Sequence, residues 1–349
     1  MLRLKGKAIV AFHVAAMFAA SSVAQLTDQV YTSGGTPTRG QITNITPAEI
    51  DISVSNQIRK ISVRDIRKIN FSGEARELRK VRDLMADGRY EDVKEALVKV
   101  SVESLETRKA LKADYDFFGA YAEARLVLRG GGDKNGAVRK LNSFIKEHPA
   151  SYHYFSAVEL IADMAVSMGN YKAASKFYGD LIKAPWNDYK LRATVLQGRS
   201  MLAEKKYEDA VKRFDMVMES QYDDPESLLQ KKMAETGKAV CLAESGNHDE
   251  GIKLVETIIA NNDPQLSGIL FGHAYNALGR CYLKANKPKD ALLAFLHVDL
   301  LFFTDSETHA ESLYNLSKLW GDQNQADRAL RARATLTQRY AGSVWAKEE

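Results

Sequence analysis

The fold of this chain is decided by a short turn that leads directly into a helical pattern, Asn286-Lys287-Pro288-Lys289-Asp290-Ala291. Two clear copies of this turn are Gly169-Asn170-Tyr171-Lys172-Ala173-Ala174 and Lys205-Lys206-Tyr207-Glu208-Asp209-Ala210. In each copy a small residue stands three positions after an anchor, which is Pro288, Tyr171 or Tyr207. Weaker copies have anchors at positions 90, 134, 248 and 326. The anchors lie about 39 residues apart on average, a spacing typical of repeated helical hairpins with short loop insertions.

The sixth repeat resembles the tetratricopeptide repeat family most closely. Its first helix carries Leu278, Gly279 and Tyr282, and its turn and second helix carry Pro288, Ala291 and Phe295. In that family a small residue on the first helix lets the second helix approach closely, and the other repeats have small residues at the same position: Ala162, Gly198, Ala239 and Ser317. The resemblance implies a mostly α-helical domain over residues 73–349, in which about seven hairpins stack into a right-handed superhelical solenoid.

Residues 25–72 have a different pattern, with five short runs rich in β-branched residues. Ile50, Ile52 and Val54 alternate with Asp51 and Ser53, which is the period of a half-buried strand. Turn residues separate the runs, as in Ser33-Gly34-Gly35-Thr36-Pro37. We therefore expect a small SH3-like or Sm-like β-barrel, and the arrangement resembles a β-module that precedes helical repeats in some exported bacterial envelope proteins.

Residues 1–24 have the pattern of a secretory signal peptide. Arg3, Lys5 and Lys7 precede an apolar run from Ala8 to Ala20, and Ser22-Val23-Ala24 supplies small residues for cleavage. The alternative, a membrane anchor, is disfavoured because this run spans only about 20 Å as a helix, short of a hydrocarbon core of roughly 30 Å. We expect an exported protein, periplasmic or extracellular, with no integral membrane segment after cleavage.

The net charge bears on whether the chain binds nucleic acid, and the cysteine content bears on whether it forms a disulfide. The formal net charge of +4 falls to +1 without Arg3, Lys5 and Lys7, which gives no global case for nucleic acid. The two cysteines, Cys241 and Cys281, occupy equivalent positions in neighbouring repeats. A disulfide is chemically feasible outside the cytoplasm, but helix axes pack roughly 8–10 Å apart, so we favour two buried free thiols.

We find no pattern that indicates catalysis. The Gly-rich loop Gly130-Gly131-Gly132 lacks the spacing of a phosphate-binding loop, and no Gly-x-Ser-x-Gly motif occurs. No histidine pair has the spacing of a zinc site, and His148 and His153 are interpreted as surface residues. We predict that the chain is not an enzyme and uses no cofactor and no metal.

The groove expected from the family is more informative. In tetratricopeptide arrays the concave face is lined by first helices at fixed distances before each anchor, and transferring that rule gives seven candidate binding residues: Arg192, Arg199, His273, Asn276, Arg280, Tyr314 and Lys318. Arg199, Arg280 and Lys318 occupy the same position in three repeats. Basic and amide side chains in a trough suit an acidic peptide or a C-terminal carboxylate. The alternative is an ordinary solvated face rich in Lys and Arg.

These observations support two functional hypotheses. The first is a non-catalytic adaptor of the cell envelope that binds a peptide or protein segment in the groove. The second is a self-associating scaffold for outer-membrane or cell-wall assembly, in which the repeats form a homo-oligomer. A nucleic-acid binder that uses Arg59, Arg64 and Arg67 is disfavoured by the signal peptide and by the acidic residues nearby.

Overall fold

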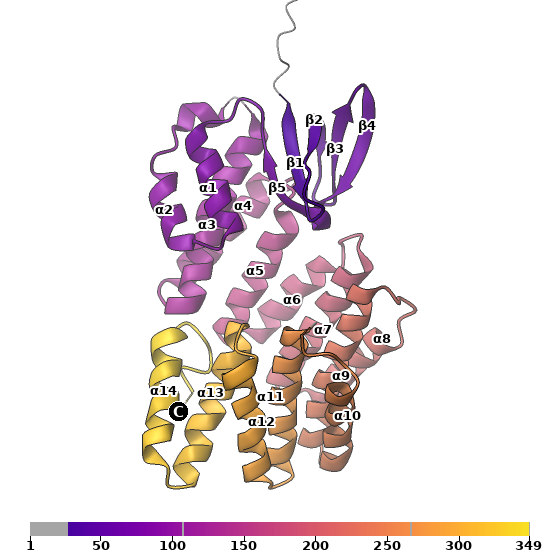
Figure 1. The fold of residues 1–349 in the computed structure, drawn as a ribbon, viewed down its shortest axis with the longest axis vertical. Coiled ribbons are helices and arrows are strands. Elements are labelled where there is room, and N and C mark those ends of the chain that lie inside the picture. Colours follow the sequence, from indigo (N-terminus) through magenta and orange to yellow (C-terminus); the bar gives the residue numbers. More distant parts are fainter. Residues whose placement is uncertain (1–26, 107, 266, 349) are drawn as a thin grey trace, which may run out of the picture.

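The computed structural model describes residues 27–348 except 107 and 266, and the expected signal peptide lies outside these residues. The chain folds into a small sheet followed by helices that succeed one another along a curved array (Figure 1). The strands are β1 (Asp28–Thr32), β2 (Thr38–Ile45), β3 (Glu49–Val54), β4 (Gln57–Ser62) and β5 (Ile66–Asn70), with a short 3-10 helix, η1 (Val63–Asp65), before β5.

The helices form seven consecutive hairpins within the described residues, as the repeat pattern predicts. One further 3-10 helix, η2 (Val102–Leu105), lies between the first two hairpins. The hairpins are α1 (Arg76–Ala86) with α2 (Tyr90–Leu97), α3 (Lys109–Gly130) with α4 (Lys134–Glu147), α5 (Tyr154–Ser167) with α6 (Tyr171–Leu181), α7 (Asn187–Ala203) with α8 (Tyr207–Met218), α9 (Pro225–Glu244) with α10 (His248–Ala260), α11 (Gly268–Lys284) with α12 (Pro288–Leu301), and α13 (Ser306–Asp322) with α14 (Ala326–Arg339).

The sheet contains five antiparallel strands in the order β4-β3-β2-β1-β5, at the five runs that the alternation predicts. It is not closed, because β4 and β5 form opposite edges, so the prediction of a closed small barrel is not confirmed. The outer strand β4 is largely exposed, and its Ile58 is 65% accessible. Because β4 is largely exposed and has little apolar surface to bury, the hydrophobic effect does not favour closure of β4 onto β5.

The sheet and the first hairpins share one hydrophobic core. Val30, Ile52 and Ile69 of the sheet belong to the same buried cluster as Leu78 and Val81 of α1. This cluster extends to α5, and further clusters follow along α5–α7, α7–α12 and α12–α14. The core therefore runs through the molecule as a chain of neighbouring contacts, which is the organisation of a solenoid.

Small residues on the first helices allow the close packing that the repeat pattern implies. A Cβ atom added at Gly279 would lie 2.6 Å from Cζ of Phe295, and one at Gly198 would lie 2.7 Å from Cε1 of Phe214. Cys241 and Cys281 are free and buried, which confirms the expectation of two separate thiols. No helix within the described residues combines the length and apolarity needed to cross a membrane.

Candidate functional site

The first helices of successive hairpins contact one another, as α7 contacts α9 and α9 contacts α11. Arg199 of α7 extends across α9, where its Nη2 lies 3.5 Å from Sδ of Met233. Its Nη1 donates a hydrogen bond of 3.1 Å to Nε2 of His273 in α11. Two of the predicted binding residues are therefore brought together by the curvature of the array, although 74 positions separate them in the sequence.

Arg199 is a cation in a poorly solvated position. Burial lowers the pKa of its guanidinium, while the charges of Asp305 and Glu311 act in the opposite direction. Among the described residues no carboxylate forms an ion pair with it; its hydrogen bonds go to a neutral ring and to a sulfur atom. Burial and the nearby Arg199 lower the pKa of His273 to about 3, so its imidazole is neutral. The guanidinium thus has unused capacity to bind an anionic or carbonyl oxygen.

Asn276 and Arg280 lie on the same helix but are already engaged. Nδ2 of Asn276 donates to the carbonyl of Thr308 at 2.8 Å and to Glu311 at 3.1 Å. Arg280 lies 3.4 Å from Glu244 and 3.8 Å from Glu311. The charges around Arg280 are therefore of both signs, unlike the basic trough predicted from the spacing of Arg199, Arg280 and Lys318.

Arg192 belongs to a separate acidic cluster nearer the sheet. Its Nη2 lies 2.5 Å from Glu159 of α5, and Oη of Tyr178 donates to Asp163 at 2.7 Å. Burial and the charge of Glu159 raise the pKa of Asp163 to about 7. These two carboxylates are not among the predicted binding residues, although Glu159 has the register of Asn276 and Asp163 has that of Arg199. Extending the same spacing rule to the third repeat would have found them.

Tyr314 and Lys318 lie on α13 at the far end of the array. Nζ of Lys318 is 5.3 Å from the ring centroid of Tyr314, within range of a cation–π interaction. Trp345 also packs against Tyr314, with the two ring centroids 5.4 Å apart. The seven predicted residues therefore form three groups, with Arg192 at one end, Arg199 and its neighbours in the middle, and Tyr314 with Lys318 at the other.

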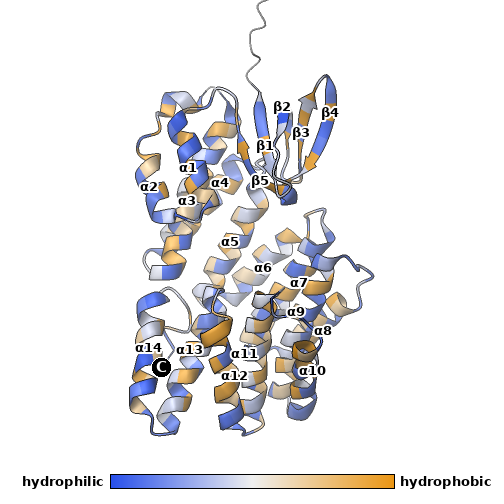
Figure 2. Cartoon of the chain, viewed as in Figure 1, coloured by the Kyte–Doolittle hydropathy of each residue, from blue (hydrophilic) through white to orange (hydrophobic). Residues whose placement is uncertain are grey.

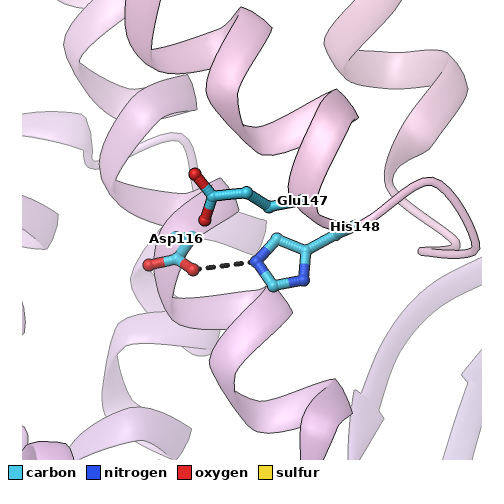
Figure 3. Close-up of side chains that lie close together, drawn as sticks. All are labelled: Asp116, Glu147 and His148. Atoms are coloured by element: carbon cyan, nitrogen blue, oxygen red, sulfur yellow. Dashed lines mark hydrogen bonds and ion pairs between the residues drawn. The ribbon is translucent and has the colours of Figure 1, made fainter.

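A cluster of three residues that could ligate a metal ion lies elsewhere, where the C-terminal end of α4 packs against α3. Figure 3 shows Asp116, Glu147 and His148 pointing toward one another, and their ligand atoms lie within 4.8 Å of one another. Asp116 also accepts a hydrogen bond of 2.6 Å from Lys112, so its charge is already compensated. An adjacent open pocket of about 470 Å³ contains further charged residues of both signs. We interpret the cluster as an ion-paired helix junction.

The interpretation of His148 and His153 as surface residues is wrong. Their side chains are only 16% and 14% accessible, respectively. His153 stacks on Phe117 with a ring separation of 3.9 Å and contacts Asp114, which in turn forms an ion pair of 2.6 Å with Arg82. This buried polar network joins α1, α3 and the start of α5. Each buried charge needs the hydrogen bonds and opposite charges that the other members provide, so the three helices are held together. Its role is structural.

Comparisons with solved structures identify the fold. A tetratricopeptide repeat protein from Parabacteroides merdae superposes with a TM-score of 0.52 at 19% identity, over 75% of this chain and 91% of that one. A Rap protein complexed with Competence and Sporulation Factor gives a TM-score of 0.52 at 12% identity, over 77% of this chain and 76% of the other. No protein-family model and no curated protein sequence matches the chain. The likeness confirms the fold that the repeat motifs predict.

Proposed function

We propose that this chain, which has the tetratricopeptide repeat fold, is a non-catalytic adaptor that binds a peptide or protein segment on the inner side of its first helices. The expected signal peptide and right-handed superhelix belong to this proposal, as does a role in the cell envelope. The Rap protein of the same fold is bound to Competence and Sporulation Factor, which is consistent with ligand binding by such an array.

The observation that supports this proposal most directly is the environment of Arg199. It is held by His273 and Met233 from two later hairpins, yet it has no paired carboxylate among the described residues. A desolvated guanidinium is stabilised by an oxygen acceptor that enters the site. A backbone carbonyl, an acidic side chain or a chain-terminal carboxylate would supply one, and Asp305 and Glu311 would limit the number of negative charges that can enter.

The test is a capture experiment with residues 25–349 as bait and envelope extract as the source of partners. Proteins that bind are identified by mass spectrometry, and their affinity is then measured with purified components. Arg199→Gln removes the positive charge and shortens the side chain, while keeping it polar. Because a charge-assisted hydrogen bond contributes roughly 1.5–3 kcal/mol, we expect the affinity to fall by about tenfold or more.

The matched control is Arg331→Gln, which changes an exposed residue on the outer helix α14. This variant should retain the affinity of the wild-type protein. Circular dichroism of both variants establishes that the fold is intact. Equal affinity for all three proteins would remove Arg199 from the binding site and would leave the groove proposal without its main support.

A second candidate function, the self-associating scaffold, is favoured by exposed apolar residues on the outer helices. Leu293, Leu300 and Leu301 of α12 are 56%, 66% and 63% accessible, and Leu330 of α14 is 67% accessible. Figure 2 shows apolar residues along α12. If this surface mediates self-association, sedimentation should reveal a concentration-dependent dimer that survives high salt and is lost in Leu293→Glu/Leu300→Glu. A monomer at all concentrations would exclude this candidate.

A further inference from the structure

The segment that follows α14 returns to the other end of the array. Residues 340–348 form no helix or strand. Gly342 nevertheless donates its backbone N–H to the carbonyl of Arg129, at the end of α3, at 3.3 Å. Repeats in an open solenoid contact only their neighbours, so a contact between the seventh and the second hairpin is unusual. The segment closes the array, as Figure 1 shows by the position of α13 and α14 next to the end of α3.

The packing at Gly342 is specific for glycine. A Cβ atom there would lie 1.9 Å from the carbonyl oxygen of Leu128 and 2.6 Å from that of Val127. The backbone of the segment therefore lies directly on the backbone of the last turn of α3. Lys134 adds a second attachment, since its buried Nζ donates to the carbonyls of Gly342 and of Ser167. The end of α3 and the start of α4 thus both contact Gly342, which lies 208 positions after Lys134 in the sequence.

The rest of the segment lies against α13 and α14. Ser343 is buried and donates to Glu307 at 2.8 Å. The ring of Trp345 packs on that of Tyr314, and the carbonyl of Ala346 accepts a hydrogen bond of 3.3 Å from Arg333. Tyr340 adds a second aromatic contact, since its Oη lies 2.8 Å from Nδ1 of His309. A segment of another protein that adopts the same turns would meet the same groups.

We propose that residues 340–347 are a latch, an internal peptide ligand that closes the array and covers the Tyr314 end of the groove. A partner segment that reaches Tyr314 must displace the latch. It would then make the contacts that the latch makes now, which favours a peptide with an aromatic residue at the position of Trp345. The statement about the partner rests on the proposed function, whereas the closure of the array does not.

Hydrogen exchange on the full chain without any ligand tests the closure. Gly342→Ala places a Cβ atom against the backbone of α3, and Lys134→Met removes the two carbonyl contacts. The matched controls are Gly321→Ala, where a Cβ atom meets no other atom within 4 Å, and Lys140→Met, which changes an exposed residue of α4. We expect exchange about tenfold faster at residues 126–132 and 340–347 in both latch variants and in neither control. Unchanged exchange in a folded Gly342→Ala would overturn the latch.

Binding in trans tests the second part of the proposal. A labelled peptide with the sequence of residues 340–348 should bind to Gly342→Ala, in which the latch is released, at least tenfold more tightly than to the wild-type protein. The same peptide with Trp345→Ala should bind weakly to both. If exchange shows an open latch but the peptide does not bind, the latch is not a ligand mimic. Loss of partner binding in Arg199→Gln is scored separately, so this experiment and the test of the proposed function can fail independently.

Discussion

Arg108 binds both carboxylate oxygens of Asp28, at 2.6 and 3.0 Å, and this pair joins the sheet to the helical repeats. Asp28 begins β1, and Arg108 immediately precedes α3. The same carboxylate accepts backbone hydrogen bonds of 2.8 Å from Ile42 in β2 and from Ser72 after β5. Asp28 is almost fully buried, so one side chain fixes three segments around a single charge.

Asp28→Asn should therefore destabilise the protein. The substitution keeps the size of the side chain but leaves Arg108 without its counter-charge and places an amide where an acceptor is required. Breaking a buried pair in this way costs about 3 kcal/mol. The midpoint of urea unfolding measures the change, with Asp65→Asn as the control, because Asp65 is 57% accessible and should change stability by less than about 0.5 kcal/mol. Similar midpoints for both variants would contradict the role assigned to Asp28.

Gly279→Leu should disrupt the sixth hairpin through overpacking. Because a Cβ atom at this position already lies 2.6 Å from Phe295, a larger side chain must push α11 and α12 apart. We expect a loss of stability on the order of 1–3 kcal/mol, measured by thermal unfolding. Beyond the sixth hairpin, hydrogen exchange should increase in the fifth and seventh hairpins before it increases in the first, since neighbouring repeats carry the stability of a solenoid. Gly321→Leu is the control, and an equal melting temperature for both variants would mean that the repeat register is wrong.

The strands and hairpins could be predicted because both rest on local patterns. Alternation at Ile50, Ile52 and Val54 places β3, and the turn before Ala291 places α12, without knowledge of the rest of the chain. The openness of the sheet depends on which strand edges meet, and single-strand alternation does not contain that information. Closure of the array by Gly342 likewise depends on the summed curvature of seven hairpins.

The charge of the surface around Arg280 depends on residues that the spacing rule does not include. The family spacing predicts that Arg199 and His273 face the same surface, and the two side chains are joined by a hydrogen bond of 3.1 Å. It gives no account of Glu244, which lies outside the spacing rule at the end of α9 and reaches Arg280 in the next hairpin. Counting only rule positions in four repeats therefore overestimated the basic character of the surface. Electrostatics depends on neighbours from every packed element, whereas a spacing rule samples one face.

Cys241 and Cys281 should be unreactive in the folded protein. Burial raises the pKa of both thiols to about 12. Since the thiolate is the nucleophile, about one thiol in ten thousand is reactive at pH 8. A colorimetric thiol reagent should therefore detect no reactive cysteine in the native protein and two after unfolding in guanidinium chloride. Rapid reaction of either thiol in the native state would show that the helices around it open readily, and Cys→Ser variants would identify which one.

Asp163 should make the protein less stable as the pH rises from about 4 to 7. Burial and the charge of Glu159 raise its pKa in the folded protein to about 7, from 3.8 in the unfolded chain, although Tyr178, Arg192 and Arg125 act in the opposite direction. Between these two values the folded state binds more protons than the unfolded state. The stabilisation is therefore complete below pH 3.8 and is lost as the pH rises through 7.

Asp163→Asn imitates the protonated carboxyl and keeps the acceptor for Tyr178. We expect this variant to match the wild-type protein near pH 3.5 and to be more stable at pH 8, by up to about 4 kcal/mol for a pKa raised by roughly three units. Urea unfolding at several pH values measures the difference, and Asp209→Asn, which changes an exposed carboxylate of α8, provides the control. A constant difference between Asp163→Asn and the wild-type protein across this range would mean that Asp163 is ionised throughout, and that Arg192 compensates both Glu159 and Asp163.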